Sequence, residues 1–244
     1  MFDLPPLTRG ALRARIARTP ADRAEALALR GRVFRGGGND RDEFDAGATH
    51  LLIEHAGRLR PIGCLRVMAT PPGRARDSYS GRVYDLTALD RLAAPGLEVG
   101  RLCLAPEARA GPDALRLAFA ILARAALSSG ARVLFGCASF PGADPDRHLA
   151  TLRGLRRHVA PTHLLPGPRA REVLHFAVPR PGEATGGARP ASLPPLLRGY
   201  LAMGGRIGGH AVIDRDLDTT HVLTMLEPSA LPAGRRRVLE AEAA

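Results

Sequence analysis

The apolar positions of the chain fall into short runs of strand length, separated by segments in which apolar residues recur at helical spacing. Apolar runs bounded by turn residues or prolines are typical of buried strands. They predict strands at residues 12–17, 50–54, 61–68, 97–106, 132–142, 174–178, 211–214 and 220–226. A turn around Gly57 joins the second and third runs, which are therefore expected to form a hairpin.

Helix signals alternate with these strands. Thr19 and Pro20 supply an N-cap and a first-turn proline for a helix that ends near Phe34. Asp144 and Pro145 begin a later helix with a basic end at residues 152–158, and further helical patterns precede Gly130 and cover residues 193–205. The alternation of strands and helices predicts an α/β fold.

Two charged residues interrupt the apolar run at 97–106. A carboxylate or guanidinium in a buried strand costs several kcal/mol unless it is paired, so Glu98 and Arg101 indicate either structural ion pairs or function. Three positions apart on a regular strand, their side chains are expected on opposite faces of the sheet. The strand leads through a small-residue loop at 107–113 into a helix, a geometry that suits a substrate phosphate.

Other polar residues at the ends of predicted elements are candidates for the same site. Arg30 and Arg32 lie at a helix end, where interaction with the helix dipole is an equally good explanation. Arg66 interrupts an apolar strand, and Ser139 ends one, where it can donate a hydrogen bond or simply terminate the strand. Carboxylates surround Phe44 in a segment typical of a solvated loop, although they can also hold a cationic substrate group: Asp42, Glu43 and Asp45.

Composition narrows the function. The 244 residues are 45% hydrophobic and have a formal net charge of +11, which favours acidic partners. The chain contains no lysine and is rich in Ala, Gly, Arg and Pro, so part of this charge reflects GC-rich coding. Aromatic residues make up only 4%, which argues against a stacking platform for nucleic acid, and no nucleic-acid partner is expected. Basic clusters are therefore more informative than the total charge.

The remaining signals concern the compartment. The 3 cysteines, Cys64, Cys103 and Cys137, lie in apolar runs and are expected to be buried free thiols in a reducing environment. No signal-peptide pattern or membrane-spanning stretch is found, and the histidines show no metal-binding spacing. We therefore expect a cytoplasmic protein without a metal site. The arginines at 235–237 suggest peripheral contact with the inner membrane.

The motifs together resemble the bacterial ornithine N-acyltransferases. The resemblance covers roughly residues 18–226 and rests on residues 29–34 (LRGRVF), 43–45 (EFD), 63–66 (GCLR), 98–101 (EVGR), 135–142 (FGCASFPG), 193–200 (LPPLLRGY), 211–214 (AVID) and 218–222 (DTTHV). The first four motifs are also similar to acyl-homoserine lactone synthases, although the region after Leu193 is not. Two positions depart from the family pattern: Gly31 stands where an aromatic residue is usual, and His221 where an acidic one is common.

The resemblance implies an acetyltransferase-like α/β fold, with a mixed central sheet flanked by helices as in the autoinducer synthases. We expect this core at 1–178, a Gly/Pro/Ala-rich linker at 179–192, and an extension at 193–244 packed on the same domain. The resemblance also implies transfer of a 3-hydroxyacyl group from an acyl carrier protein thioester to the α-amino group of L-ornithine, which gives lyso-ornithine lipid. The donor's phosphopantetheine arrives on the carrier protein, and no permanently bound cofactor is expected.

Residue roles follow as expectations. Glu98 is the first candidate for the proton acceptor, with Ser139 as a hydrogen-bond donor at the reaction centre. Candidates for binding the substrates, or for forming the ion pairs that shape their site, are Arg30, Arg32, Asp42, Asp45, Arg66 and Arg101. Arg153, Arg156 and Arg157 are candidates for docking the carrier protein. The alternatives are an acyl-homoserine lactone synthase, another N-acyltransferase using a carrier-protein or coenzyme A thioester, and a basic module that binds membranes or nucleic acid.

Overall fold

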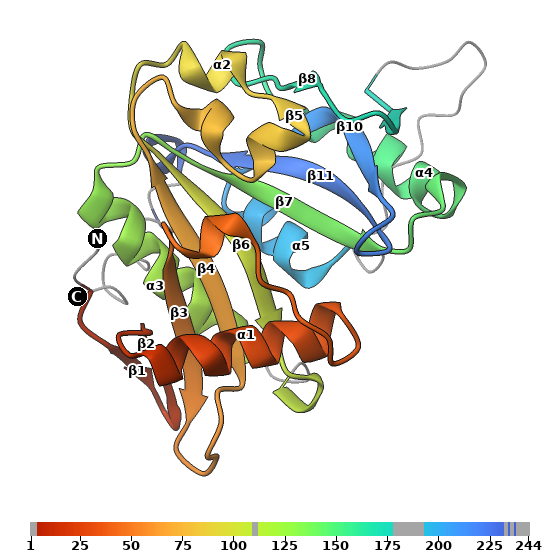
Figure 1. Cartoon of the computed structure of the whole chain (residues 1–244). Helices are drawn as coiled ribbons and strands as arrows, with labels where there is room; N and C mark the ends of the chain where they lie inside the picture. The colour runs from red at the N-terminus through yellow and green to blue at the C-terminus, as the bar shows by residue number, and fades with distance from the viewer. Residues whose placement is uncertain (1–3, 109–111, 178–192, 232–233, 235–236, 238–244) are drawn as a thin grey trace. The chain divides into compact units, whose positions relative to one another are not determined.

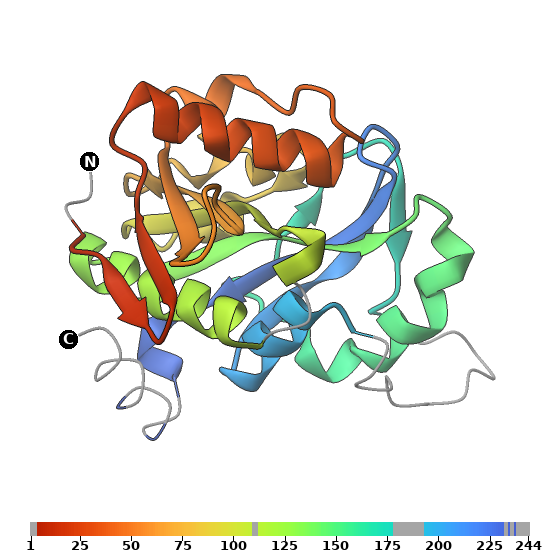
Figure 2. The same cartoon turned by 90° about the horizontal axis from the view of Figure 1, so that it is seen from below.

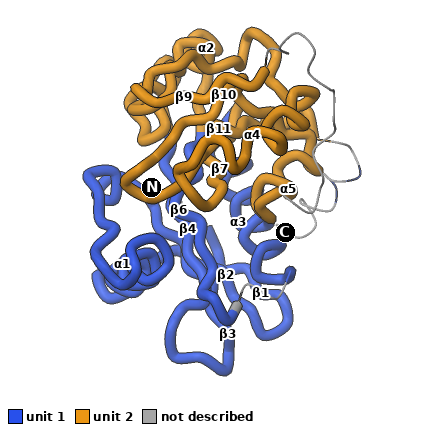
Figure 3. The backbone as a smooth tube through the Cα atoms, turned by 90° about the vertical axis from the view of Figure 1, so that its right-hand side faces the viewer, with its two compact units in different colours: residues 1–69, 97–131, 233–244 blue, residues 70–96, 132–232 orange. Residues whose placement is uncertain are grey.

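The computed structural model describes residues 4–108, 112–177 and 193–231, together with Gly234 and Arg237. Figure 1 shows the elements of the chain, and Figure 3 shows its division into two compact units. Unit 1 comprises residues 1–69, 97–131 and 233–244, and unit 2 comprises residues 70–96 and 132–232. Each unit is described by itself below.

The sheet of unit 1 is built from β1 (Leu7–Arg9), β2 (Leu12–Ile16), β3 (Thr49–His55), β4 (Gly63–Thr70) and β6 (Gly96–Leu104), in the order β1-β2-β3-β4-β6. The first four strands pair antiparallel, and β3 and β4 form the predicted hairpin. At the β4–β6 edge, the Ala105 N–H donates to the Ile62 carbonyl at 2.8 Å.

Two helices cover the opposite faces of this sheet (Figure 2). On one face, α1 (Pro20–Phe34) packs Ala26 and Leu29 onto Leu52, Cys64 and Cys103 of the strands. On the other face, α3 (Pro112–Ser129) contacts β1, β2 and β3. The start of α1 is set locally, because Thr19 and Asp22 form a reciprocal capping box.

The middle of β6 departs from regular strand geometry. Arg101 has a φ of 52°, in the left-handed region that residues other than glycine seldom occupy. Regular alternation of side chains therefore does not extend through Arg101, and the expectation that Glu98 and Arg101 lie on opposite faces loses its basis. Backbone of this kind persists only where its surroundings hold it.

The sheet of unit 2 has the order β7-β11-β10-β9, all antiparallel: β7 (Val133–Pro141), β11 (Thr219–Leu226), β10 (Arg206–Asp214) and β9 (Val173–His175). A separate two-stranded ribbon joins β5 (Tyr84–Asp85) to β8 (Gly167–Pro168). One face of the larger sheet packs on α4 (Pro145–Gly154) and α5 (Pro195–Ala202), through Leu152 and Leu197. The other face packs on β5 and α2 (Thr87–Asp90), with Tyr84 and Leu89 in that core.

Most predicted elements are confirmed, with shifts at their ends. The predicted helix after Asp144 was too long: α4 ends at Gly154, and a separate 3₁₀ turn covers Arg156–His158. The strands β1, β5 and β8 were not predicted, because two or three residues are too few to show a period. Three segments lie outside the described residues: the predicted linker at 179–192, the middle of the loop expected to hold a phosphate (109–111), and the arginines at 235–236.

The core of unit 2 makes a prediction about acid stability. Burial lowers the pKa of His210 to about 4, with a further contribution from nearby His175, and burial also lowers the pKa of His221 to about 4. In the unfolded chain both imidazoles titrate near about 6.5. The unfolded state therefore binds more protons between those values, so stability present above pH ~6.5 is lost as the pH falls toward 4.

We expect this loss to be on the order of 3 kcal/mol per histidine, since each pKa unit corresponds to about 1.4 kcal/mol. His210→Gln should flatten the dependence of the urea unfolding free energy on pH over this range. The exposed His163 provides the control, because His163→Gln should leave the slope unchanged. An unaltered slope in the His210 variant would contradict this explanation.

Candidate functional site

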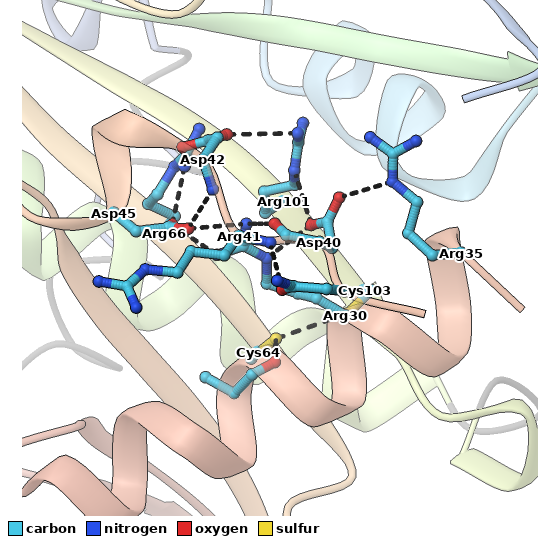
Figure 4. Close-up of polar contacts among 12 residues, drawn as sticks. Arg30, Arg35, Asp40, Arg41, Asp42, Asp45, Cys64, Arg66, Arg101 and Cys103 are labelled. Atoms are coloured by element: carbon cyan, nitrogen blue, oxygen red, sulfur yellow. Dashed lines mark hydrogen bonds and ion pairs between the residues drawn. The ribbon is translucent and has the colours of Figure 1, made fainter. Parts of the chain in front are cut away.

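A network of arginine and aspartate side chains occupies the α1 side of unit 1 (Figure 4). Its members come from α1, from the loop that follows it, and from the two strands β4 and β6: Arg30, Arg35, Asp40, Asp42, Asp45, Arg66 and Arg101. Five of the six residues predicted to bind the substrates, or to shape their site, thus share one network, with Asp42 and Asp45 at its centre. We call this set the charge network.

Arg30 is the most deeply buried cation of the charge network, with 1% of its side chain exposed. Its Nε donates to Asp40 Oδ2 at 2.8 Å, and its Nη1 donates to Asp45 Oδ1 at 2.6 Å. Its Nη2 donates to the Asp40 carbonyl at 2.5 Å and to Asp45 Oδ2 at 3.2 Å. The guanidinium is thus satisfied from several sides by protein oxygens, and interaction with the helix dipole is not what holds it.

The strand arginines reach the same carboxylates from the sheet. Arg66 Nη1 donates to Asp42 Oδ1 at 2.5 Å and to Asp45 Oδ1 at 2.8 Å, and its guanidinium lies 5.8 Å from the centroid of the Phe44 ring. Arg101 Nε donates to Asp40 Oδ2 at 2.9 Å, and its Nη2 donates to Asp42 Oδ2 at 3.3 Å. Three segments distant in sequence are therefore tied together by charge-assisted hydrogen bonds.

The acidic segment is a structured turn and not the solvated loop that was one of its two interpretations. Asp42 caps the 3₁₀ turn Glu43–Asp45 by accepting from the Phe44 N–H at 3.0 Å, and Asp45 Oδ2 accepts from the Asp42 N–H at 2.9 Å. These hydrogen bonds within the turn orient both carboxylates independently of the arginine contacts. Asp45 is buried with the network, whereas Asp42 keeps 17% of its side chain exposed.

The pKa shifts within the charge network favour the ionised forms of Asp45 and Arg30. Burial opposes ionisation of Asp45, but hydrogen bonds from Arg30, the Asp42 N–H and Arg66 outweigh it and lower the pKa of this carboxyl to about 2. The same balance raises the pKa of Arg30: burial opposes its charge, and the bonds to Asp45 and Asp40 outweigh it. His50 lies beside them, with Nε2 3.7 Å from Asp45 Oδ1, and burial lowers its pKa, which keeps the imidazole neutral.

The close approach of the loop after α1 depends on Gly31. A Cβ added there would lie 2.1 Å from the Gly38 carbonyl oxygen, while the Gly31 carbonyl accepts from the Gly37 N–H at 2.9 Å. A larger side chain would push the loop away from the helix and carry Asp40 with it. The glycine that departs from the family pattern is thus matched to the course of this loop.

The other predicted residues of unit 1 differ in their surroundings. Glu98 is buried on β6, at 4% exposure, as expected for a carboxylate held in the sheet. Arg32 is exposed in the last turn of α1 and is not a member of the charge network. Cys64 and Cys103 are buried thiols as predicted, with their sulfurs 3.5 Å apart beneath Arg30.

The remaining predicted residues lie in unit 2. Ser139 is exposed near the end of β7, where its register partner on β11 is His221. Arg153 ends α4, and Arg156 and Arg157 follow in the 3₁₀ turn. Arg157 is exposed, whereas Arg156 Nε donates to the Phe176 carbonyl at 2.5 Å and so fixes the strand end after β9. Cys137, predicted to be buried, is only half-buried.

Sequence reasoning missed Asp40 and Arg35 as members of the charge network, and His50 as its neighbour. Asp40 lies in a polar loop after three glycines, a context that usually means solvent exposure, yet its side chain is fully buried. A weak signal was available, since three arginines predicted in apolar elements need more carboxylates than Asp42 and Asp45 supply.

The described residues contain no group of three or more His, Cys, Asp or Glu side chains placed to hold a metal ion. Among the same residues, no helix combines the length and the hydropathy needed to cross a bilayer.

Comparison with known proteins places the chain in a class. A family model for the acetyltransferase (GNAT) domain matches residues 27–118, which include the charge network. The structure of an N-acyl amino acid synthase from uncultured soil microbes superposes with a TM-score of 0.54 at 12% identity, and covers 92% of this chain and 97% of its own. The predicted acetyltransferase-like α/β fold is therefore confirmed.

Closer relatives specify the family. The L-ornithine N(alpha)-acyltransferase of Rhodobacter capsulatus is 31% identical over 207 residues, which cover 80% of this chain and 77% of the relative. Its counterpart from Brucella abortus is 33% identical over 203 residues, which cover 77% and 69%. The chain belongs to the L-ornithine N(alpha)-acyltransferase family, as its motifs predicted, and is an acyltransferase.

The charge network makes a stability prediction. Asp45→Asn keeps the shape of the side chain but removes the charge that faces Arg30 and Arg66, which leaves two buried guanidinium groups short of a counter-charge. Breaking a buried pair in this way typically costs about 3–5 kcal/mol. Urea unfolding followed by circular dichroism should show a loss of this size.

A matched variant controls for the substitution itself. Asp77→Asn removes a carboxylate from an exposed pair with Arg74, for which a change below about 1 kcal/mol is expected. Equal unfolding free energies for the two variants would show that the charge network contributes no more than a surface ion pair.

Proposed function

We propose that this protein transfers a 3-hydroxyacyl group from an acyl carrier protein thioester to the α-amino group of L-ornithine, which gives lyso-ornithine lipid. The observation that carries the proposal is the match to curated L-ornithine N(alpha)-acyltransferases over more than two thirds of their length. The motifs similar to acyl-homoserine lactone synthases lie in the first half of the chain. The match to the curated L-ornithine N(alpha)-acyltransferases extends through the C-terminal region as well.

The reaction asks for a base and for stabilisation of an oxyanion. The neutral α-amine attacks the thioester carbonyl, its proton passes to a base, and the phosphopantetheine thiol leaves after the tetrahedral intermediate collapses. Glu98 is the base in this proposal, because it is a buried carboxylate on β6 between the apolar residues Leu97 and Val99. The proton it accepts can then neutralise the departing thiolate, directly or through water. No covalent acyl-enzyme is needed.

The charge network divides into an inner and an outer part. Arg30 and Asp45 are enclosed by protein partners and act as positioning residues, which hold Asp42 and the strand arginines in place. Asp42 and Arg101 lie at the more exposed edge, with 17% and 9% of their side chains accessible. A carboxylate next to a guanidinium complements the ammonium and carboxylate groups of an amino acid. We assign substrate binding to this edge, together with the exposed Arg32.

In unit 2 we assign Ser139 as a hydrogen-bond donor to the acyl donor, since its hydroxyl is exposed at the end of a buried strand. The developing oxyanion is left to backbone N–H groups after the central strand, since a preorganised donor there typically contributes about 2.7–4 kcal/mol to catalysis.

Glu98→Gln tests the base. The amide keeps the size of the side chain but accepts no proton at neutral pH, so we expect turnover to fall by about two orders of magnitude or more with the fold retained. Turnover would be measured by mass spectrometry of the N-acyl product, and the fold by circular dichroism.

The exposed Glu107 supplies the control, because Glu107→Gln should leave turnover near that of the wild type. A folded Glu98→Gln enzyme with near-normal turnover would remove Glu98 from the mechanism.

Carrier-protein docking is proposed for the basic residues after α4. Burial lowers the pKa of His158, and the positive charges of Arg157 and Arg206 lower it further. The direction of this pKa shift indicates a positive potential around His158. The surface comprises Arg206 of β10 and the predicted docking residues Arg153, Arg156 and Arg157. Acyl carrier proteins are acidic, so such a potential accelerates their association.

Charge reversal tests this surface. Arg157→Glu should raise the KM for an acyl carrier protein thioester several-fold, and the effect should weaken with added salt, because the Debye length shrinks to about 3 Å at 1 M. The KM for the matching coenzyme A thioester should change little, and the carrier-protein donor should be much preferred. Arg156 is the poorer choice, because its substitution also removes the bond to Phe176.

Arg91→Glu, at an exposed residue after α2, is the control for the effect of charge reversal by itself. NMR titration gives a second readout: binding of the carrier protein should raise the pKa of His158. If the wild type used both donors equally well, the proposed docking of a carrier protein would be contradicted, and the enzyme would be an ordinary coenzyme A-dependent acyltransferase.

Contact with a membrane surface is a separate part of the proposal, because the product is an amphiphile and the chain is strongly basic. It is supported by charge alone.

A further inference from the structure

One face of the sheet in unit 2 gathers neutral polar side chains between apolar ones. Phe135, Leu223 and Met225 pack with Tyr84 on this face. In the register of β7 and β11, Ser139 lies directly opposite His221, and Cys137 lies opposite Leu223. Because side chains alternate along a strand, Ser139 and His221 share the face that holds Tyr84. The exposed hydroxyl of Ser139 thus lies beside the buried imidazole of His221.

Tyr84 sets the tautomer of His221. The Tyr84 Oη lies 2.9 Å from the His221 carbonyl oxygen and 3.1 Å from His221 Nδ1. The single hydroxyl proton is donated to the carbonyl, which can only accept. The same hydroxyl oxygen then accepts from Nδ1–H, so the proton of the neutral ring resides on Nδ1 and Nε2 carries a lone pair.

The surroundings disfavour positive charge at this position. Burial lowers the pKa of His221 to about 4, Asp214 opposes the shift, and the neighbouring His210 adds to it. His210 packs 5.1 Å from the Tyr84 ring, and its buried Nε2 has no hydrogen-bond partner among the described residues. A ligand group that binds here is therefore neutral, and it meets an acceptor in His221 and a hydroxyl in Ser139.

We propose that His221, oriented by Tyr84 and assisted by Ser139, binds the hydroxyl group on the acyl chain of the donor and so selects hydroxylated acyl chains. A hydroxyl needs one acceptor and can accept one hydrogen bond, and His221 Nε2 and the Ser139 hydroxyl supply both. The ammonium groups of ornithine do not fit, because a buried neutral imidazole of low basicity offers them no counter-charge. This inference rests on the proposed function.

Discrimination between two donors tests it. Kinetics would compare carrier-protein thioesters of equal chain length with and without the 3-hydroxyl, both with L-ornithine. A site built to bind a hydroxyl rejects the analogue that lacks it, because its polar groups are then left unpaired. We expect the wild type to prefer the hydroxylated donor at least tenfold in kcat/KM, and His221→Phe to reduce this ratio toward one. Tyr84→Phe removes the hydroxyl that holds the His221 proton on Nδ1, so we expect it to reduce the ratio in part.

The ratio separates selection from a structural role, because a loss of folding or of general positioning lowers kcat/KM for both donors equally. His163→Phe, at an exposed histidine, should leave the ratio unchanged. A wild type without preference, or a His221→Phe variant with the full preference, would overturn the inference while leaving ornithine acylation intact. Absence of N-acylornithine with either donor would instead overturn the proposed function.

Binding provides a second measurement where a variant turns over too slowly. Amide analogues of the two thioesters on the carrier protein should differ at least tenfold in Kd for the wild type, and less for His221→Phe. Equal Kd values for the wild type would also overturn the inference.

Discussion

The buried guanidinium of Arg30 is the constraint on which the candidate site of unit 1 depends. A cation taken out of water carries a penalty of several kcal/mol unless its surroundings supply opposite charge and hydrogen bonds in good geometry. Asp40 and Asp45 supply both, and these two aspartates also receive Arg101 and Arg66 from the strands. Satisfying Arg30 therefore fixes the loop after α1 against β4 and β6.

The same constraint explains local features that are otherwise costly. The left-handed backbone at Arg101 accompanies a guanidinium bound to Asp40 and Asp42, and Gly31 permits the approach of the loop that carries Asp40. Backbone strain of this kind is typical of functional sites, where the surrounding contacts hold it. Placement of the inner pairs leaves the outer carboxylate and guanidinium, Asp42 and Arg101, in a defined arrangement, which suits the proposed binding of a zwitterionic amino acid.

The buried histidines on the Tyr84 face of unit 2 are neutral, in contrast to the buried ion pairs of unit 1. They are kept neutral because burial lowers the pKa of both His210 and His221 to about 4. A neutral imidazole retains its hydrogen-bonding capacity without the desolvation cost of a charge. The proposed charged site in one unit and the proposed neutral site in the other match the chemistry of the two substrates of the proposed reaction, an amino acid and an acyl chain.

The sequence by itself determined the elements and the family. Capping residues at Thr19 and Asp22, and strands marked by apolar runs, are local signals, and charges at Glu98, Arg66 and Arg101 inside apolar runs indicated a site. Only the tertiary structure decided the partners. Arg101 meets Asp40 across 61 positions and Tyr84 meets His221 across 137, separations over which no local pattern acts. Whether a polar residue in a glycine-rich loop is exposed or buried, as at Asp40, depends on the charges that the fold brings to it.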